Sequence, residues 1–161
     1  MKRFSQINKH KIIKEQKEEI EHSIENIETD EVGQEGSEIV KFFSKLFESK
    51  EMVYIHHLQL KGDKGSFAKH ETLVNYYKKI SEMLDDTIET YQGQYGTIDG
   101  YEIIDTKDKK YKDIVEYLEE TSEWLKHSKG CISEEDTHLH RLIDNIFCLI
   151  YRTIYKLKFL K

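Results

Sequence analysis

The sequence predicts an all-α protein, a bundle of four helices. Its 161 residues contain no proline, although average usage would give about eight at this length. The eight glycines fall in a few clusters, so long stretches carry no turn signal. Within those stretches, apolar residues recur every three or four positions, which is the spacing of one helix face. A chain of this length is expected to form a single domain.

The first 35 residues differ in charge from the rest and are predicted to form a helical or flexible N-terminal arm. Residues 15–35 contain nine acidic residues and one lysine, whereas the formal net charge of the whole chain is −6. Ile20, Ile24 and Ile27 add a thin apolar stripe at helical spacing. Two interpretations stay open, a solvated arm and an arm that packs on a neighbouring subunit. Residues 36–161 then form the bundle, and the chain outside residues 15–35 is close to neutral.

The four predicted helices cover about residues 37–60, 66–96, 107–128 and 133–160. Ser37 and Ser66 are expected to be the N-caps of the first two, because a serine hydroxyl accepts a hydrogen bond from the first turn. The glycines at 93 and 96 are expected to end the second helix. Ser133 and Asp136 have the spacing of a capping box and are predicted to start the fourth. Trp124 is expected to lie in the core.

Composition excludes several functional classes. Acidic residues outnumber basic ones by 31 to 25, which argues against a protein whose main task is to grip nucleic acid. We find no membrane span or signal peptide. Two cysteines, Cys131 and Cys148, give no disulfide framework and favour a reducing cytoplasm. The sequence has no glycine-rich phosphate loop, nucleophile elbow or paired-cysteine zinc motif.

Four residues are candidate metal ligands: His57, His70, Asp85 and Glu89. On one helix, Asp85 and Glu89 lie about 40° apart and His70 lies about 60° from Asp85. Imidazoles with carboxylates suit iron, manganese or zinc. Fifteen residues of helix separate His70 from Asp85, about 22 Å, so the two cannot bind one ion within a single chain. A site that uses all four residues needs two chains related by a twofold axis.

These residues lie in segments that resemble the Dps mini-ferritins, the DNA-binding proteins from starved cells. The resemblance covers residues 37–160 and is carried by the run His57-Leu-Gln-Leu-Lys-Gly62, by Phe67, His70, Asp85 and Glu89, and by residues 135–160. Residues 66–70 and 91–96 are closer still to a group of phage-encoded Dps-like proteins. The resemblance implies a ferritin-like four-helix bundle and a homo-oligomeric shell that oxidises and sequesters Fe(II), often with peroxide, in the cytoplasm of the host cell. It assigns His57 and His70 to one chain and Asp85 and Glu89 to its partner.

Three features depart from the family pattern. Val74 stands where the family has an acidic ligand, Leu58 replaces a tryptophan, and residues 62–65 look like an insertion in the turn. Glu71 is adjacent to His70 but points about 100° away around the helix. An alternative therefore stays open, a non-enzymatic phage-encoded bundle with a degenerate or vacant metal site that binds a host ligand or host protein. DNA binding through the basic residues 1–14 is a third, less favoured hypothesis.

Two further pairs, each of a glutamate and a histidine, are interpreted as residues that do not bind a metal. Glu135 and His138 have Glu-x-x-His spacing, but they occur once, at a helix start, where capping is the simpler explanation. Glu123 and His127 are expected to form a solvated pair on one helix face.

Overall fold

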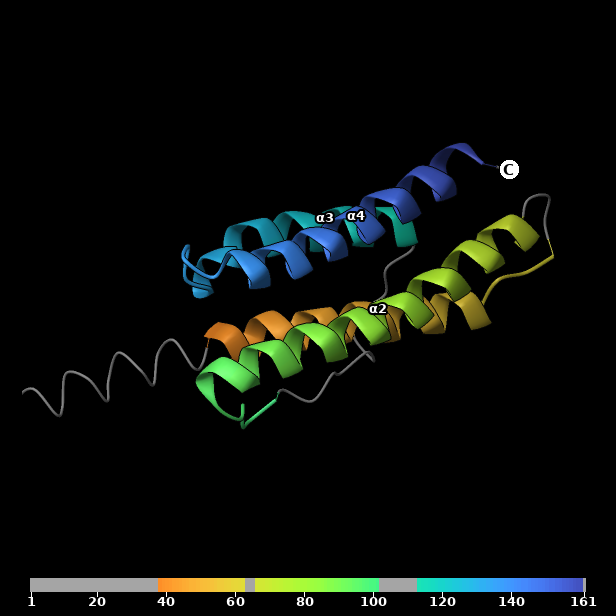
Figure 1. The fold of residues 1–161 in the computed structure, drawn as a ribbon. Helices are drawn as coiled ribbons and strands as arrows, with labels where there is room; N and C mark the ends of the chain where they lie inside the picture. Colours follow the sequence, from red (N-terminus) through yellow and green to blue (C-terminus); the bar gives the residue numbers. More distant parts are fainter. Residues whose placement is uncertain (1–37, 63–65, 102–112, 161) are drawn as a thin grey trace, which may run out of the picture. The chain divides into compact units, whose positions relative to one another are not determined.

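A computed structural model of the chain describes residues 38–62, 66–101 and 113–160. The predicted arm, residues 1–35, and the basic segment within it lie outside these described residues. Within them the regular structure is entirely helical, with no strand (Figure 1). The all-α prediction is therefore confirmed for this part of the chain.

Residues 38–58 form the first described helix, which we call the first helix. It is followed by α2 (Ser66–Tyr95), α3 (Ile114–Ser128), the short 3-10 helix η1 (Lys129–Cys131) and α4 (Thr137–Phe159). The first helix lies alongside α2, and α3 lies alongside α4 (Figure 1). Helices α2 and α4 also pack against each other.

The predicted start of the third helix was wrong. We expected it near Lys107, but the helix begins at Ile114, after Asp113 in an extended conformation (φ −128°, ψ 122°). The Asp113 carboxylate accepts a hydrogen bond of 2.7 Å from the backbone N–H of Val115. Asp113 is thus the N-cap, and its side chain satisfies a donor that the first helical turn leaves free.

The predicted capping box at the start of the fourth helix was also wrong. The helix begins at Thr137 and Asp136 is its N-cap residue, but the Asp136 carboxylate makes no capping hydrogen bond to α4. It accepts hydrogen bonds instead from Gln94 and Tyr95 at the end of α2. The Asp136 carboxylate therefore makes a tertiary contact, whereas the sequence pattern assigned it to capping of its own helix.

Helix α2 ends close to the position that its glycines predicted. Gly93 lies inside the helix, which continues to Tyr95. Gly96 then adopts φ +94°, and its backbone N–H bonds to the carbonyl of Gln92 at 2.9 Å. That left-handed conformation favours glycine, which has no Cβ to clash, so Gly96 is the residue that stops the helix.

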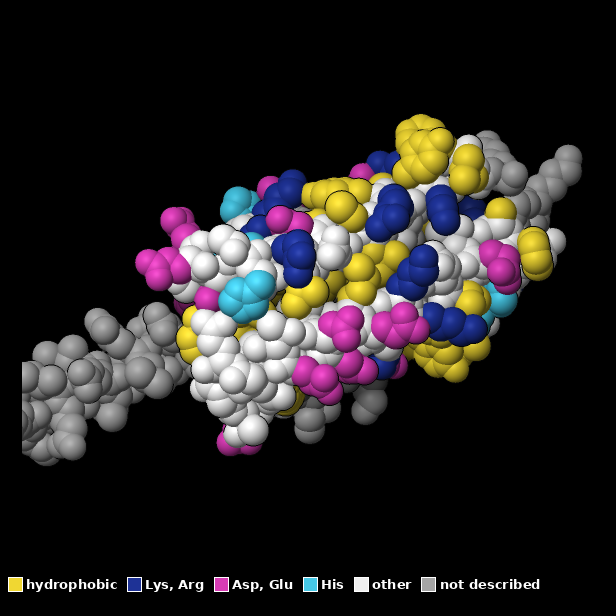
Figure 2. Space-filling view, in the orientation of Figure 1, with side chains coloured by type: hydrophobic (Ala, Val, Ile, Leu, Met, Phe, Trp, Pro, Cys, Tyr) yellow, Lys and Arg dark blue, Asp and Glu magenta, His cyan; other side chains and the backbone are white. Residues whose placement is uncertain are grey.

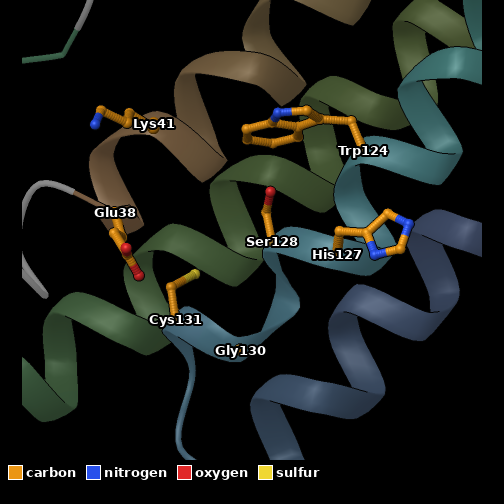
Figure 3. Close-up of a pocket in the computed structure, with 7 residues that line it drawn as sticks. All are labelled: Glu38, Lys41, Trp124, His127, Ser128, Gly130 and Cys131. Carbon is orange, nitrogen blue, oxygen red and sulfur yellow. The ribbon is translucent and has the colours of Figure 1, made fainter.

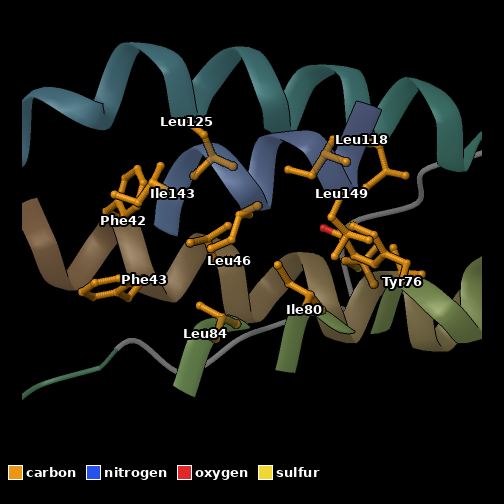
Figure 4. Packing of buried hydrophobic residues seen from close by; sticks show 14 of the residues in the cluster. Phe42, Phe43, Leu46, Tyr76, Ile80, Leu84, Leu118, Leu125, Ile143 and Leu149 are labelled. Atoms are coloured by element: carbon orange, nitrogen blue, oxygen red, sulfur yellow. The ribbon is translucent and has the colours of Figure 1, made fainter. Parts of the chain in front are cut away.

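One cluster of buried apolar side chains joins all four long helices (Figure 4). Its fully buried members include Phe42, Phe43 and Leu46 of the first helix, Tyr76, Ile80 and Leu84 of α2, Leu118 and Leu125 of α3, and Ile143 and Leu149 of α4. Trp124 was wrongly expected in this core. Its indole stacks on the outer side of Phe42, with ring centroids 6.5 Å apart, and is 37% exposed.

Candidate metal site

The first helix and α2 form a hairpin that brings two histidines together. His57 lies in the last turn of the first helix and His70 in the second turn of α2. Their Nε2 atoms are 2.8 Å apart and their ring centroids 4.4 Å apart. The expectation that these two imidazoles face each other across the turn is confirmed.

Two tyrosines hold the His57 ring in place. Tyr54, one turn earlier in the first helix, stacks on it with ring centroids 5.8 Å apart and planes inclined by 28°. Tyr77 of α2 lies 5.4 Å from the same ring on the facing helix. His57 therefore has little freedom to turn away from His70, and the pair is preorganised.

The contacts around the two rings assign their protons. A separation of 2.8 Å between ring nitrogens requires that one donates and the other accepts. Oε1 of Glu71 lies 3.5 Å from Nδ1 of His70, and a carboxylate there favours a proton on that nitrogen. His70 Nε2 is then the acceptor and His57 Nε2 the donor. The His57 Nδ1 is buried and has no hydrogen-bond partner among the described residues.

In this tautomer the Nε2 lone pair of His70 accepts the hydrogen bond from His57, so a metal ion bound by both Nε2 atoms has to displace the Nε2 proton of His57. Two imidazole nitrogens on one tetrahedral ion, with bonds of about 2.0–2.1 Å, lie about 3.4 Å apart. The observed separation of the two Nε2 atoms, 2.8 Å, is shorter than this, and a small rotation of either side chain removes the difference. The pair therefore fits a first-row transition metal ion once the Nε2 proton of His57 has been released.

The described residues of one chain supply only part of a coordination shell. In residues 38–62, 66–101 and 113–160, no group of three or more His, Cys, Asp or Glu side chains could hold an ion. Asp85 and Glu89 lie on α2, the same unbroken helix as His70, so the separation of about 22 Å between His70 and Asp85 holds. Both carboxylates are exposed. The structure thus brings the two histidines together and leaves the two acidic residues at the other end of the helix.

Glu71 contacts the histidine pair despite its direction around the helix. Its direction about 100° from His70 around α2 excludes it from the Nε2 side of the ring, but its carboxylate still reaches Nδ1. A carboxylate behind a ligand imidazole fixes the ring and raises its basicity. In the sequence, Glu71 directly follows His70, but helical angles alone place its side chain away from the histidine ring. Val74, which takes the place of the family's acidic ligand, is half-buried.

At the other end of α2, His138 of α4 belongs to a hydrogen-bonded network. Gln94 donates a hydrogen bond of 2.7 Å to Asp136, and Tyr95 donates a short one to the same carboxylate. His138 Nε2 lies 2.9 Å from the amide oxygen of Gln94. The hydrogen bond from Tyr95 lowers the pKa of Asp136, and the same contact raises the pKa of Tyr95 to about 12. His138 is thus engaged in a contact between helices, which supports the non-metal interpretation.

A pocket of about 260 Å³ lies beside Trp124, between the start of the first helix and the end of α3 (Figure 3). It contains His127 and Cys131. His127 lies 3.2 Å from Glu123, which confirms the predicted pair on the helix face. Burial raises the pKa of the Cys131 thiol to about 11, so it is neutral at physiological pH. A neutral thiol is a poor nucleophile and a poor metal ligand, so the pocket lacks an activated group.

The described helices include none that is long and apolar enough to cross a bilayer. No curated protein and no solved structure matches the chain. A family model does match residues 57–157, more than half of the chain. The matched segment begins at His57 and includes His70, Asp85 and Glu89. The chain therefore belongs to DUF5856, a family of unknown function.

Proposed function

We propose that this protein is a Dps-like member of the ferritin-like proteins, which binds and oxidises Fe(II) at a site shared between two copies of the chain. The observation that carries the proposal is the pair of Nε2 atoms of His57 and His70, 2.8 Å apart at the end of a helical hairpin. Two imidazoles that contact each other supply two metal ligands, which is an incomplete ligand set. The long helices around a single core support the ferritin-like assignment.

The remaining ligands come from a second chain. Asp85 and Glu89 are separated from the histidines of their own chain by four turns of α2, and both are exposed. A twofold axis places the carboxylates of one copy beside the histidines of the other, and it creates two equivalent sites. His57 and His70 then bind iron on one side and Asp85 and Glu89 on the other. Manganese and zinc are alternative ions for the same donors.

Iron is the substrate of this reaction, and the ligand residues determine which oxidation state of iron is favoured. Two Fe(II) ions lose one electron each to hydrogen peroxide, whose O–O bond breaks. With two protons taken from solvent, the peroxide leaves as two water molecules. Carboxylate oxygens from Asp85 and Glu89 stabilise Fe(III) more than Fe(II), because the electrostatic attraction grows with the charge of the ion. The site therefore favours the oxidised product.

The cellular location and the oligomeric shell are inferred from the family resemblance. The likeness of residues 66–70 and 91–96 to phage-encoded Dps-like proteins supports a role in the cytoplasm of a host cell, as part of a homo-oligomeric shell.

Iron oxidation kinetics test this function. Fe(II) is mixed anaerobically with the full chain, peroxide is added, and the appearance of Fe(III) is followed by absorbance. We expect His57→Ala and Asp85→Ala each to lower the rate at least about tenfold, because each removes a ligand. His127→Ala, at an exposed histidine on α3, is the matched control and should keep the wild-type rate. A wild-type protein that takes up no iron would instead support the non-enzymatic bundle.

A further inference from the structure

The pocket beside Trp124 has a volume of about 260 Å³ and lies apart from the candidate metal site. Three elements build it: the start of the first helix, the end of α3, and η1 (Figure 3). Glu38 in this pocket and His57 are nineteen residues apart on one helix, about 28 Å. Pockets for drug-sized ligands begin at about 300 Å³, so this one suits a smaller molecule. Because the pocket has no activated group, it supports binding rather than catalysis.

The indole of Trp124 is a rigid wall of the pocket. It stacks on the fully buried ring of Phe42, with ring centroids 6.5 Å apart and planes inclined by 27°. The indole is nevertheless 37% exposed, and Figure 3 shows it over the space that the Ser128 hydroxyl faces. Among aromatic side chains, the face of tryptophan attracts cations most strongly. The wall therefore favours a ligand that carries a positive charge.

The Glu38 carboxylate supplies a negative charge at the edge of the same space, beside the Cys131 thiol (Figure 3). Burial raises the pKa of that thiol to about 11, and the charge of Glu38 adds to the shift. No residue of the described part of the chain forms an ion pair or hydrogen bond with this carboxylate. The Ser128 hydroxyl makes no capping hydrogen bond to η1, which it precedes. A carboxylate and a hydroxyl are thus left to accept hydrogen bonds from a ligand.

The two basic residues in the lining of the pocket do not neutralise this charge. The Lys41 side chain points away from the Glu38 carboxylate and from the indole (Figure 3). His127 lies 3.2 Å from Glu123, which is on its own helix and outside the lining. The negative charge of Glu38 therefore favours a cationic ligand and disfavours an anionic one.

We propose that the pocket beside Trp124 binds a small organic amine in its protonated form. The ammonium group donates hydrogen bonds to the Glu38 carboxylate and the Ser128 hydroxyl, and it lies against the indole. The hydrocarbon part of the amine contacts Gly130 and the neutral thiol of Cys131. The inference does not depend on the proposed iron site, which is at the other end of the first helix.

A built pocket differs from an acidic surface, which attracts cations without selecting among them. Acidic side chains gather over the later part of α2 (Figure 2), and Asp86 is an exposed carboxylate in that part of the helix. Glu38→Gln removes a charge from the pocket, and Asp86→Asn removes one from this surface, each with little change in shape. The two variants are therefore a matched pair.

Trp124 is the only tryptophan in the sequence, so its fluorescence reports on the pocket. The metal-free full chain is titrated with butylammonium at constant ionic strength, with butyrate and butanol as an anionic and a neutral probe of similar size. We expect butylammonium alone to give a saturable change, in the millimolar range because so small a ligand makes few contacts. Glu38→Gln should weaken this binding at least about tenfold and Ser128→Ala about threefold. Asp86→Asn should change it less than about twofold.

Equal responses to butylammonium and butanol, or unchanged binding by Glu38→Gln, would overturn the inference. Circular dichroism shows whether each variant is folded. If Glu38→Gln disturbs the start of the first helix, Ser128→Ala tests the pocket from α3, and wild-type affinity in that variant would count against the site. His57→Ala should bind butylammonium as tightly as wild type does. A protein that binds butylammonium in this way but oxidises no iron would keep the inference and overturn the proposed function.

Discussion

The two ends of α2 carry the same kinds of side chain in opposite states. At its start, His57 and His70 are hydrogen-bonded through their Nε2 atoms, 2.8 Å apart. At its end, Tyr95 and His138 belong to a network that closes on Asp136. Both ends combine imidazoles with a carboxylate close by. The difference is that the buried Nδ1 of His57 has no hydrogen-bond partner among the described residues, whereas Gln94, Tyr95, Asp136 and His138 bond to one another.

That difference distinguishes a structural role from a functional one. A polar network that is satisfied within the chain fixes the positions of helices, and the Asp136 network joins the end of α2 to the start of α4. An incomplete set of ligands leaves positions for a further group to bind. We therefore interpret the Asp136 end as structural and the histidine end as the site of function.

The largest expected effect that sharpens this comparison is on stability, at the closed end. Asp136→Ala removes the acceptor of two hydrogen bonds and leaves the Gln94 amide nitrogen and the Tyr95 hydroxyl without that partner, so we expect the thermal unfolding midpoint to fall by several degrees. Iron oxidation per folded molecule should not change. Glu135→Ala, at the exposed neighbouring carboxylate, is the control and should leave the midpoint where it is. Equal stability of Asp136→Ala and wild type would contradict the structural assignment.

The same network predicts a pH dependence. The pKa of Asp136 is lowered in the folded chain, so its contribution is present above the ordinary carboxyl pKa of about 3.9 and is lost as the pH falls below it. Wild type and Asp136→Ala should therefore differ in midpoint at pH 7 and converge in acid. The pKa of Tyr95 is raised to about 12, so its hydrogen bond is present below the ordinary tyrosine value of about 10 and weakens between the two. A difference that grows in acid would show that Asp136 acts in another way.

A smaller effect is expected behind the histidine pair. Glu71→Gln keeps the shape of the side chain but removes the charge beside Nδ1 of His70, and we expect metal binding to weaken about tenfold. Titration with Co(II), followed by its visible absorption, measures this. Glu120→Gln on α3 is the control, and a loss as large in that variant would rule out positioning by Glu71.

Much of the fold could be predicted from periodicity and punctuation. The apolar spacing located the four helices, and Gly96 marks the end of α2 because only its missing Cβ tolerates the left-handed turn. The starts of α3 and α4 could not be located in this way. Asp113 and Asp136 resemble each other as capping residues, but only Asp113 caps its own helix. The contact of Asp136 with the end of α2 depends on tertiary packing, which local patterns do not record.

The candidate site was predictable in part. Helical geometry showed that His57 and His70 flank one turn and that Asp85 lies too far along α2 to join them. It could not show that Tyr54 and Tyr77 pack around His57, because that depends on the register between two helices. It also discounted Glu71, whose flexible side chain reaches the ring despite its direction on the helix.

Mixing two inactive variants tests the shared site most directly. His70→Ala lacks a histidine ligand and Asp85→Ala lacks a carboxylate, so neither homodimer contains an intact site. In a heterodimer, one of the two sites receives its histidines from one chain and its carboxylates from the other, and both sets are unaltered. Random mixing in equal amounts makes half of the dimers heterodimers, so about a quarter of the wild-type rate of Fe(II) oxidation should return. If the mixture, after exchange of subunits is verified by mass spectrometry, stays as inactive as its components, the site is not shared between chains.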